Sequence, residues 1–303
     1  MLPNHPTCPI CAGPVDAKFC VSGYPIAACL YCTHQFANIV PKDDHVAEQF
    51  SDKYFFGGGT SGYQDYLSSA ILVKQGAERY TDVVRHHCNF GQDPSAIEVL
   101  DVGCAAGFVM QGFAKSGWSV TGIDPNRRMV EQSRDRGFEA HVGTLETIFD
   151  RATLADSKNE SFDLVSMIQV VAHLSNMTKA ATNLRRLVRE NGFILVETWD
   201  SASITAKALG ESWHEYSPPN VLHYFSKKSV DGLMANAGFG FIAGGRPAKR
   251  ITTGHARSLF DFKYGKTRWG KAMLRASQIV SDNRVIPYPA EDLFWRIYQK
   301  KNA

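Results

Sequence analysis

Between residues 95 and 200, short apolar runs alternate with amphipathic stretches, and this alternation constrains the fold more than any other feature of the chain. Apolar runs separated by helix-length amphipathic stretches are typical of βα units that build a parallel sheet. The runs that we predict as strands lie at 96–102, 119–124, 139–142, 162–167 and 193–198. A helix is expected to stop at Asn191-Gly192, because glycine commonly ends helices. The pattern predicts an α/β fold with a doubly wound sheet.

The rest of the chain divides around this core. Residues 1–41 are rich in cysteine, proline and glycine, and residues 42–94 indicate helices interrupted by a glycine loop. After residue 200 the pattern predicts a helix and two strands, at 227–237, 239–243 and 293–299. With 303 residues, 44% of them hydrophobic, the chain has material for one or two globular domains. We expect three parts: a small domain at 1–41, a helical lid or linker at 42–94 and the main domain at 95–303.

The loop after the first predicted strand, 101–107, carries small residues where a backbone can approach a ligand closely. A dinucleotide fingerprint counted from Gly103 would need a glycine at Phe108, so the spacing fits Asp-x-Gly-x-small-x-Gly instead. The carboxylate of Asp101 would repel a pyrophosphate and suits a cationic amino-acid tail. Asp124 ends the next strand, where an acid can accept from both ribose hydroxyls. The two acids together predict S-adenosylmethionine rather than NAD as the cofactor.

Two Cys-x-x-Cys pairs, Cys8 with Cys11 and Cys29 with Cys32, lie in the amino-terminal region. A two-residue spacer lets both thiolates of a pair face one tetrahedral ion, and the second pair closes the site. Four cysteines leave no open coordination position, so the pattern predicts a structural Zn²⁺. The alternatives are a redox dithiol and His34 in place of one cysteine ligand.

Charge is distributed unevenly along the chain. The segment 246–275 holds nine basic residues against the single acid Asp261, while the whole chain has a net charge of +3. Such a segment is either a docking surface for something anionic or a solvated or subunit-facing helix. In residues 1–40 the only charged side chains are Asp16 and Lys18. Gripping a phosphate backbone takes several lysines or arginines, so the amino-terminal region is a poor candidate for nucleic-acid binding.

The longest apolar stretch, 162–174, is too short and too polar to cross a bilayer, and the amino end carries no apolar run. We therefore expect a cytoplasmic protein without a transmembrane segment. In that compartment the seven cysteines would be reduced or metal-bound.

From about Lys53 to the end, the chain resembles class I S-adenosylmethionine-dependent methyltransferases. It is most similar to the branch with an N-terminal zinc-binding region, found among sugar, polysaccharide and natural-product methyltransferases. The stretches that carry the resemblance are 54–66, 100–107, 122–125, 162–174, 192–197 and 218–226. The resemblance implies a Rossmann-like, seven-stranded doubly wound sheet behind a small zinc-ribbon-like domain, and methyl transfer as the activity.

The chain departs from the family pattern at three places. Ala105 stands where the family has its middle glycine, and Ala172 precedes His173 where the family has glutamate. The stretch 220–223 reads Asn-Val-Leu-His instead of Glu-His-Leu-His. An acid and a histidine of the usual acid–base arrangement are therefore missing.

Methyl transfer requires mainly that donor and acceptor be aligned, and an acceptor hydroxyl must also lose its proton. His173 lies just beyond the fourth strand, at the carboxyl edge of the sheet, and is our candidate general base; His223 is the second candidate. Tyr63, Tyr66 and Trp213 are expected to be aromatic side chains of a lid or of the acceptor pocket. The residues expected to contact the cofactor are Asp101, Gly103, Ala105, Gly107, Asp124, Thr144, Leu145, Met167, Gln169 and Tyr63.

The expected reaction is O-methylation of a hydroxyl on a small acceptor, either glycosyl or nucleotide-linked. RNA base methylation is an alternative, because some rRNA methyltransferases also begin with a zinc knuckle. A non-catalytic module that binds S-adenosylmethionine is another, because of Ala105 and Ala172. The sequence leaves the identity of the acceptor and the oligomeric state open.

Overall fold

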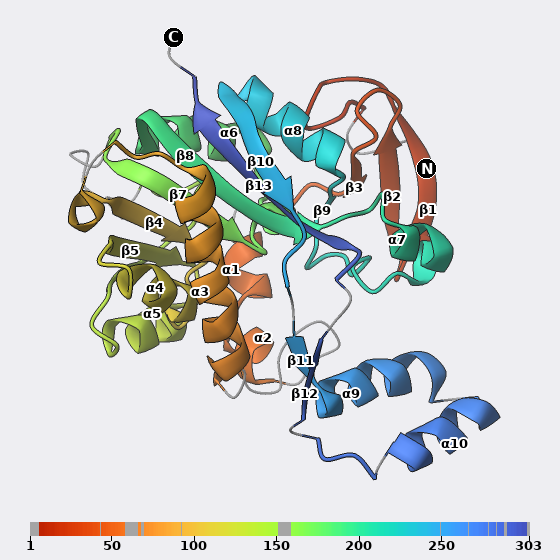
Figure 1. Ribbon diagram of the computed structural model, residues 1–303. Coiled ribbons are helices and arrows are strands. Elements are labelled where there is room, and N and C mark those ends of the chain that lie inside the picture. Colours follow the sequence, from red (N-terminus) through yellow and green to blue (C-terminus); the bar gives the residue numbers. More distant parts are fainter. Residues whose placement is uncertain are drawn as a thin grey trace. The chain divides into compact units, whose positions relative to one another are not determined.

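The computed structural model describes residues 6–301 except 43, 58–65, 68–69, 92, 151–158, 249, 266, 278, 283 and 288–289 (Figure 1). The chain forms two compact units, one made of residues 1–246 with 291–303 and the other of residues 247–290. The boundaries expected at 41 and 94 both fall inside the larger unit. The smaller unit coincides with most of the basic segment.

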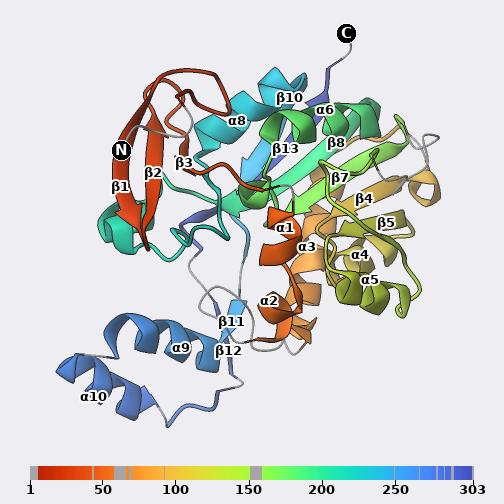
Figure 2. The ribbon, with the colours of Figure 1, turned by 180° about the vertical axis from the view of Figure 1, so that it is seen from behind.

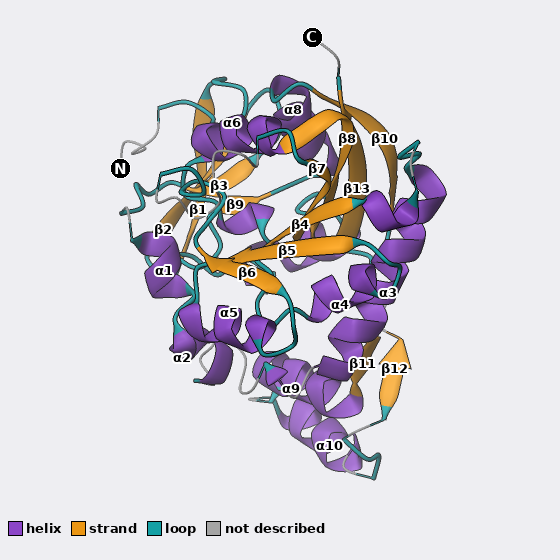
Figure 3. Ribbon diagram, turned by 90° about the vertical axis from the view of Figure 1, so that its left-hand side faces the viewer, coloured by secondary structure: helices purple, strands orange, loops and turns teal. Residues whose placement is uncertain are grey.

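The larger unit is built on a seven-stranded mixed sheet with the strand order β10-β13-β8-β7-β4-β5-β6 (Figure 3). Strands β4 to β8 run parallel, and β13 is antiparallel to both β8 and β10. The strands are β4 Glu98–Val102, β5 Ser119–Asp124, β6 Glu139–Val142, β7 Phe162–Ile168, β8 Val188–Trp199, β10 Phe239–Gly245 and β13 Leu293–Lys300. The predicted α/β class is confirmed.

Both faces of this sheet are buried, because successive side chains of a strand point to opposite sides. In β4, Val99 joins one core cluster, with Val84 and Phe113, and its neighbour Leu100 joins another, with Leu184 and Leu233. The helices that carry these partners are α3 Ala70–His87, α4 Phe108–Ala114, α6 Met177–Leu187 and α8 Lys227–Asn236. The sheet is therefore covered by helices on both sides, as a doubly wound fold requires.

Shorter helices complete the larger unit. These are α1 His45–Gln49, α2 Asp52–Phe56, α5 Arg127–Arg134 and α7 Ile204–Leu209, with 3₁₀ turns at Pro94–Ala96, Val171–His173 and Gly210–Ser212. Asn126 caps α5, because its side-chain oxygen accepts from the N–H of Met129. This cap begins the helix directly after the carboxyl end of β5.

The helix stop expected at Asn191-Gly192 was wrong. Helix α6 ends at Leu187, and β8 begins at the next residue. Phe162 pairs with Val188 but Leu164 pairs with Phe193, so the register shifts across this stretch. Asn191 adopts a φ of +60° there. The asparagine–glycine signal marks an irregularity inside a strand.

The amino-terminal region forms a second, antiparallel sheet with the strand order β1-β2-β3-β9, of which Figure 2 labels β1, β2 and β3. Its strands are β1 Val15–Val21, β2 Tyr24–Cys29, β3 Gln35–Ala37 and β9 His223–Tyr224. The last strand comes from a segment almost two hundred residues later, and Phe36 pairs with His223. The amino-terminal sheet therefore includes a strand, β9, from the part of the chain that follows β8 of the main sheet.

The smaller unit, residues 247–290, holds a two-stranded antiparallel sheet and two helices (Figures 1 and 2). Its elements are β11 Arg250–Thr252, α9 Thr253–Tyr264, α10 Arg268–Ser277 and β12 Val285–Pro287. Across the described part of the chain, every helix falls short of the length and apolar character that crossing a membrane would require.

Candidate active site

A cavity of about 160 Å³ lies at the carboxyl ends of β4, β5 and β7. Doubly wound sheets bind their ligands at this edge, because the loops that follow the parallel strands converge there. The residues predicted for the site that line the cavity are Gly103, Ala105, Asp124, Thr144, Leu145, Gln169 and His173. Residues that are up to seventy positions apart in the sequence therefore meet around one space.

Four predicted site residues, Asp101, Gly107, Met167 and His223, are not among those that line the cavity. Tyr63 lies outside the described residues. Gly107 begins α4 with a φ of +79°, and Met167 is a buried side chain of β7. Their contacts with a cofactor stay predictions.

The backbone of the loop after β4 comes close to its neighbours. Gly103 has a φ of +72°, and a Cβ at this position would lie 2.5 Å from Cγ2 of Val170, so only glycine fits. Ala105 also adopts a positive φ, +44°, where the family resemblance leads one to expect glycine. Its N–H donates to Oδ2 of Asp124 at 2.9 Å, and this bond helps to hold the strained conformation.

Asp124 is the carboxylate that lines the cavity at the end of β5. It is 4% exposed, and its Oδ1 accepts from the N–H of Asn126 at 2.8 Å. Burial raises the pKa of Asp124 to about 6, although the N–H groups of Asn126 and Ala105 act in the opposite direction. A carboxylate has about four lone-pair sites, so two acceptor positions remain for hydroxyl groups of a ligand.

Asp101 lies on β4, the strand that pairs with the strand of Asp124, and it is opposite Gly122 in the ladder. Its side chain is buried and accepts a hydrogen bond from the hydroxyl of Ser166. Burial raises the pKa of Asp101 to about 7, and the charge of Asp124 adds to this rise. Two buried carboxylates at one strand edge are stabilised by a nearby positive charge, which a cationic ligand would supply.

His173 also lines the cavity. Its Nδ1 lies 2.9 Å from the backbone oxygen of Asn220. A carbonyl oxygen can only accept, so Nδ1 carries the hydrogen and Nε2 keeps a lone pair. Burial lowers the pKa of His173, which holds the imidazole neutral near pH 7. The ring of Phe50 packs edge-on against it at 4.8 Å between centroids.

His223, the second candidate base, has both ring nitrogens engaged inside the protein. Nδ1 lies 3.1 Å from Nε2 of His34, and Nε2 lies 3.0 Å from the backbone oxygen of Leu174. His223 is a buried residue of β9, the last strand of the amino-terminal sheet. His223 therefore connects the amino-terminal region, through His34, to the segment after β7, through Leu174.

Glu197 is a site residue that the sequence analysis missed. It is a buried carboxylate at the end of β8 that accepts from Nε2 of Gln169 at 2.9 Å and from the hydroxyl of Tyr80. Because Nε2 of Gln169 is held by Glu197, the amide oxygen of Gln169 is left as an acceptor on a cavity-lining residue. The sequence signal that could have identified Glu197 is that it is the one acid in the predicted strand 193–198.

One part of the cavity lining is apolar and aromatic, with Val46, Phe50, Tyr54, Phe55 and Tyr66. These residues come from α1, α2 and the segments that follow them. The expected pocket residue Tyr66 is therefore placed at the cavity.

Trp213, another expected pocket aromatic, lies elsewhere. It is buried in the core cluster beneath the amino-terminal sheet, and its indole N–H donates to Asp292 at 3.1 Å.

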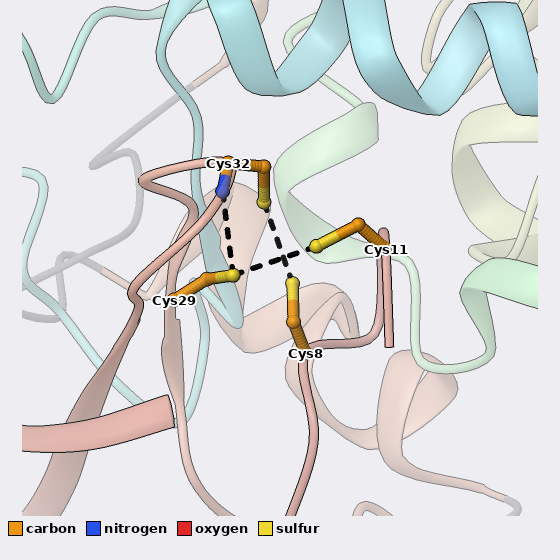
Figure 4. A group of neighbouring side chains, drawn as sticks. All are labelled: Cys8, Cys11, Cys29 and Cys32. Atoms are coloured by element: carbon orange, nitrogen blue, oxygen red, sulfur yellow. Dashed lines mark hydrogen bonds between the residues drawn. The ribbon is translucent and has the colours of Figure 1, made fainter. Parts of the chain in front are cut away.

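The four cysteines of the two pairs come together, and their sulfur atoms all lie within 4.8 Å of one another (Figure 4). Sγ of Cys8 is 3.5 Å from that of Cys32, and Sγ of Cys11 is 3.5 Å from that of Cys29. These distances exceed an S–S bond of about 2.05 Å and match thiolates around one tetrahedral ion with bonds of about 2.3 Å. The cluster can hold one metal ion.

The backbone turns of the two Cys-x-x-Cys pairs have similar geometry. The residue after each pair, Ala12 and Thr33, adopts a positive φ of +55° and +62°. Backbone N–H groups point at the sulfur atoms, from Ile10 to Cys8 and from Tyr31 to Cys29, each at 3.4 Å. Such bonds favour the thiolate form that binds metal. The ring of His34 instead bonds to His223.

Comparison with known proteins places the main domain in a family. The model of a methyltransferase domain family matches residues 74–243, which is more than half of the chain. A solved S-adenosylmethionine-dependent methyltransferase from Thermotoga maritima, described as a possible histamine N-methyltransferase, has a TM-score of 0.50 and 18% identity. The match covers 82% of this chain and 98% of that one, and it shows the shared fold.

Curated relatives are similar over part of their length. A ubiquinone biosynthesis O-methyltransferase from Rhizobium leguminosarum bv. trifolii is 31% identical over 116 residues, 36% of this chain and 46% of the relative. One from Agrobacterium fabrum is 28% identical over 148 residues, 46% of this chain and 56% of the relative. The chain thus spans about half the length of these relatives. Their names give no support to the sugar and polysaccharide branch. The chain belongs to the methyltransferase domain family.

Proposed function

We propose that the protein methylates a hydroxyl oxygen of a small acceptor and that His173 is the general base. One observation carries the proposal: His173 lines the cavity, and its Nδ1 is 2.9 Å from the backbone oxygen of Asn220. This bond fixes the neutral tautomer in which Nε2 can take a proton.

The residues around the cavity fit the cofactor. Asp124 offers two acceptor positions for ribose hydroxyls, and the loop at Gly103 and Ala105 offers backbone where the amino-acid tail would lie. Thr144 and Leu145, after β6, would contact the adenine. When bound, S-adenosylmethionine supplies a methyl group on a sulfonium that is already activated for displacement.

In the proposed step, transfer of the methyl group is accompanied by transfer of one proton. The acceptor oxygen forms a bond to the methyl carbon, the bond from that carbon to sulfur breaks, and the hydroxyl proton passes to Nε2 of His173. The imidazolium that results is stabilised by its bond from Nδ1 to the oxygen of Asn220. The amide oxygen of Gln169, oriented by Glu197, is an acceptor that can hold a donor group of either ligand.

The cavity lining favours an acceptor with a flat, apolar ring, such as a phenol. Phe50, Tyr54 and Tyr66 supply aromatic surface. Among the described residues that line the cavity, the charged side chains are Asp124 and Glu146, and both are acids. A diphosphate would meet no cation among these described residues, so the lining supports a phenol over the nucleotide-linked acceptor that the sequence led us to expect. The relatives' name, O-methyltransferase of ubiquinone biosynthesis, agrees with this choice.

The experiment is an assay of S-adenosylhomocysteine release with a panel of catechols and phenols, free glycosides, nucleotide sugars and RNA. We expect turnover with phenolic acceptors. Turnover only with glycosides or nucleotide sugars would restore the acceptor predicted from the sequence, and turnover only with RNA would restore RNA methylation. Tight cofactor binding without turnover on any acceptor would favour the non-catalytic module.

We also propose that the cysteine cluster holds a structural Zn²⁺. Four sulfur ligands complete a tetrahedral site, so no position is left for a reactant. The ion would stabilise the turns at Cys8–Cys11 and Cys29–Cys32 and take no part in methyl transfer.

A further inference from the structure

The smaller unit, residues 247–290, differs in charge from the rest of the protein, and we refer to it as the insert. It contains nine basic residues and two acidic ones, Asp261 and Asp282, within a chain whose net charge is +3. The remainder of the chain is therefore net acidic. One of the two acids, Asp282, is already paired with Arg257. The insert thus carries a dense excess of positive charge.

Helix α10 exposes both apolar and basic side chains to the solvent. Trp269 and Met273, one helical turn apart, are 53% and 57% exposed. Lys271 and Arg275, also one turn apart, are exposed as well. At 100° per residue the two pairs lie about 160° apart around the helix axis, so α10 has an apolar stripe and a basic stripe on opposite sides. A helix built for the core of a protein would instead bury the tryptophan.

The exposed apolar surface continues beyond the helix. Ile279 is 90% exposed, and Val280 and Val285 are 39% and 41% exposed. These side chains belong to a segment that is tied down: the guanidinium of Arg257 donates to the backbone oxygens of Ser277 and Val280 at 2.6 and 2.8 Å. Their exposure is therefore a feature of an ordered turn, which Arg257 anchors to α9.

The ring of Trp269 also has a fixed place. It packs edge-on against Phe260 of α9, with 5.7 Å between the ring centroids. Helices α9 and α10 of the insert (Figure 2) therefore hold a half-exposed tryptophan at a defined position through this ring contact. Amphipathic tryptophan rings are favoured where an apolar phase meets water.

Three kinds of partner could cover such a surface, and its chemistry distinguishes them. Single-stranded nucleic acid stacks its bases on aromatic rings, whereas methionine, isoleucine and valine contribute most of this apolar surface. A second copy of the chain would set the positive charge of one insert against that of the other. An anionic lipid surface suits both the exposed apolar side chains and the basic ones, because it offers an apolar layer beneath negative headgroups.

We propose that the insert docks on anionic lipid bilayers, with α10 lying in the plane of the interface. Trp269, Met273 and Ile279 enter the acyl boundary, while Lys271 and Arg275 contact the headgroups. The attachment is peripheral, and it is independent of which acceptor the active site methylates.

The test is co-sedimentation of the full-length protein with vesicles of phosphatidylcholine alone and of phosphatidylcholine mixed with phosphatidylglycerol. We expect binding to the mixed vesicles, weakening as salt is added, and little binding to phosphatidylcholine alone. Lys271→Gln with Arg275→Gln should weaken binding about 25-fold, at about fivefold for each charge. The matched control, Lys207→Gln with Lys301→Gln, removes two exposed charges outside the insert and should change binding less than about twofold.

A second measurement reports on the apolar contact. Brominated lipid should quench the fluorescence of the wild type more than that of Trp269→Phe, because Trp269 would lie in the acyl boundary. Absence of vesicle binding, or equal loss in the control pair, would overturn the proposal. Tighter binding to single-stranded RNA than to vesicles would assign the surface to nucleic acid instead. A dimer in solution that Met273→Ser dissociates would assign it to a second copy.

Discussion

His173 combines three properties of a general base, namely a fixed tautomer, a neutral ring and a place on the cavity wall. We expect His173→Ala to lower turnover by about 10²–10⁴-fold while cofactor affinity stays nearly intact. Turnover is measured by S-adenosylhomocysteine release at saturating substrates, and affinity by calorimetry. His86→Ala, an exposed histidine of α3, is the control and should leave both unchanged. Lost affinity with preserved saturated turnover would instead make His173 a cofactor contact.

Asp124 is expected to determine the affinity for the cofactor. Asp124→Ala removes the acceptors for the ribose and should weaken binding by about 1.5–3 kcal/mol for each charge-assisted hydrogen bond that is lost. Isothermal titration calorimetry with S-adenosylhomocysteine measures the change, and Asp135→Ala, an exposed acid after α5, is the control. An unchanged dissociation constant in the Asp124 variant would show that the ribose binds elsewhere.

The raised pKa of Asp124, about 6, predicts how binding depends on pH. Below this value the carboxyl takes a proton and loses acceptor positions, so affinity for S-adenosylhomocysteine should fall by up to about tenfold per pH unit. Above it the affinity should level off. Asp124→Asn should bind weakly with a flatter profile, because its amide does not titrate. A variant that kept the slope of the wild type would assign the titration to another group.

At the scale of elements, the cysteine cluster and the active site are connected through β9. Strand β3, which follows the second cysteine pair, pairs with His223 and Tyr224, and the segment before them contains Asn220. Asn220 holds the tautomer of His173. Asn220 lies three residues before β9, so disruption of the amino-terminal sheet should also displace the backbone oxygen that orients the proposed general base.

We therefore expect about one equivalent of zinc per chain, and loss of the metal should reduce activity indirectly. Cys29→Ser should release zinc, speed amide hydrogen exchange in residues 218–226 and lower turnover. Cys20→Ser, an exposed cysteine of β1, is the control and should alter none of these. Full occupancy of zinc in the Cys29 variant, or faster exchange confined to residues 6–41, would contradict this connection.

Elements with strong local signals could be predicted from the sequence. The run 119–124 is a strand with the predicted bounds, and the helix at 227–237 differs by one residue, because alternation, capping and breakers act over a few residues. The pairing of β3 with β9 could not be predicted, since it joins segments about 190 residues apart and β9 has two residues. The helix stop at Asn191 failed because the same dipeptide also fits an irregular strand.

The same division holds within the candidate site. The glycine loop and Asp124 have fixed spacing along the sequence, so the sequence predicted them and the structure brings them to one cavity. Glu197 and the aromatic residues Phe50 and Tyr54 reach the site only through tertiary packing. Their sequence neighbourhoods carry no spacing that points to a ligand.

At the scale of the whole molecule, the positive charge is concentrated in one unit and the proposed chemistry in the other. The sequence identified the charge of segment 246–275, but not that residues 247–290 fold as a separate unit. The charge of this segment follows from its residues alone. Its folding as a separate unit depends on contacts within it, such as those of Arg257 with Ser277 and Val280.

The insert leaves and re-enters the larger unit at neighbouring points, because Gly245 at the end of β10 pairs with Trp295 near the start of β13. These two strands are antiparallel and hydrogen-bonded, so a short turn in place of residues 247–290 would make them an ordinary β-hairpin. In the history of such a gene, this segment could be acquired or discarded in a single event without disturbing the seven-stranded sheet. Membrane attachment would then be a trait that spreads among related methyltransferases independently of the reaction they catalyse.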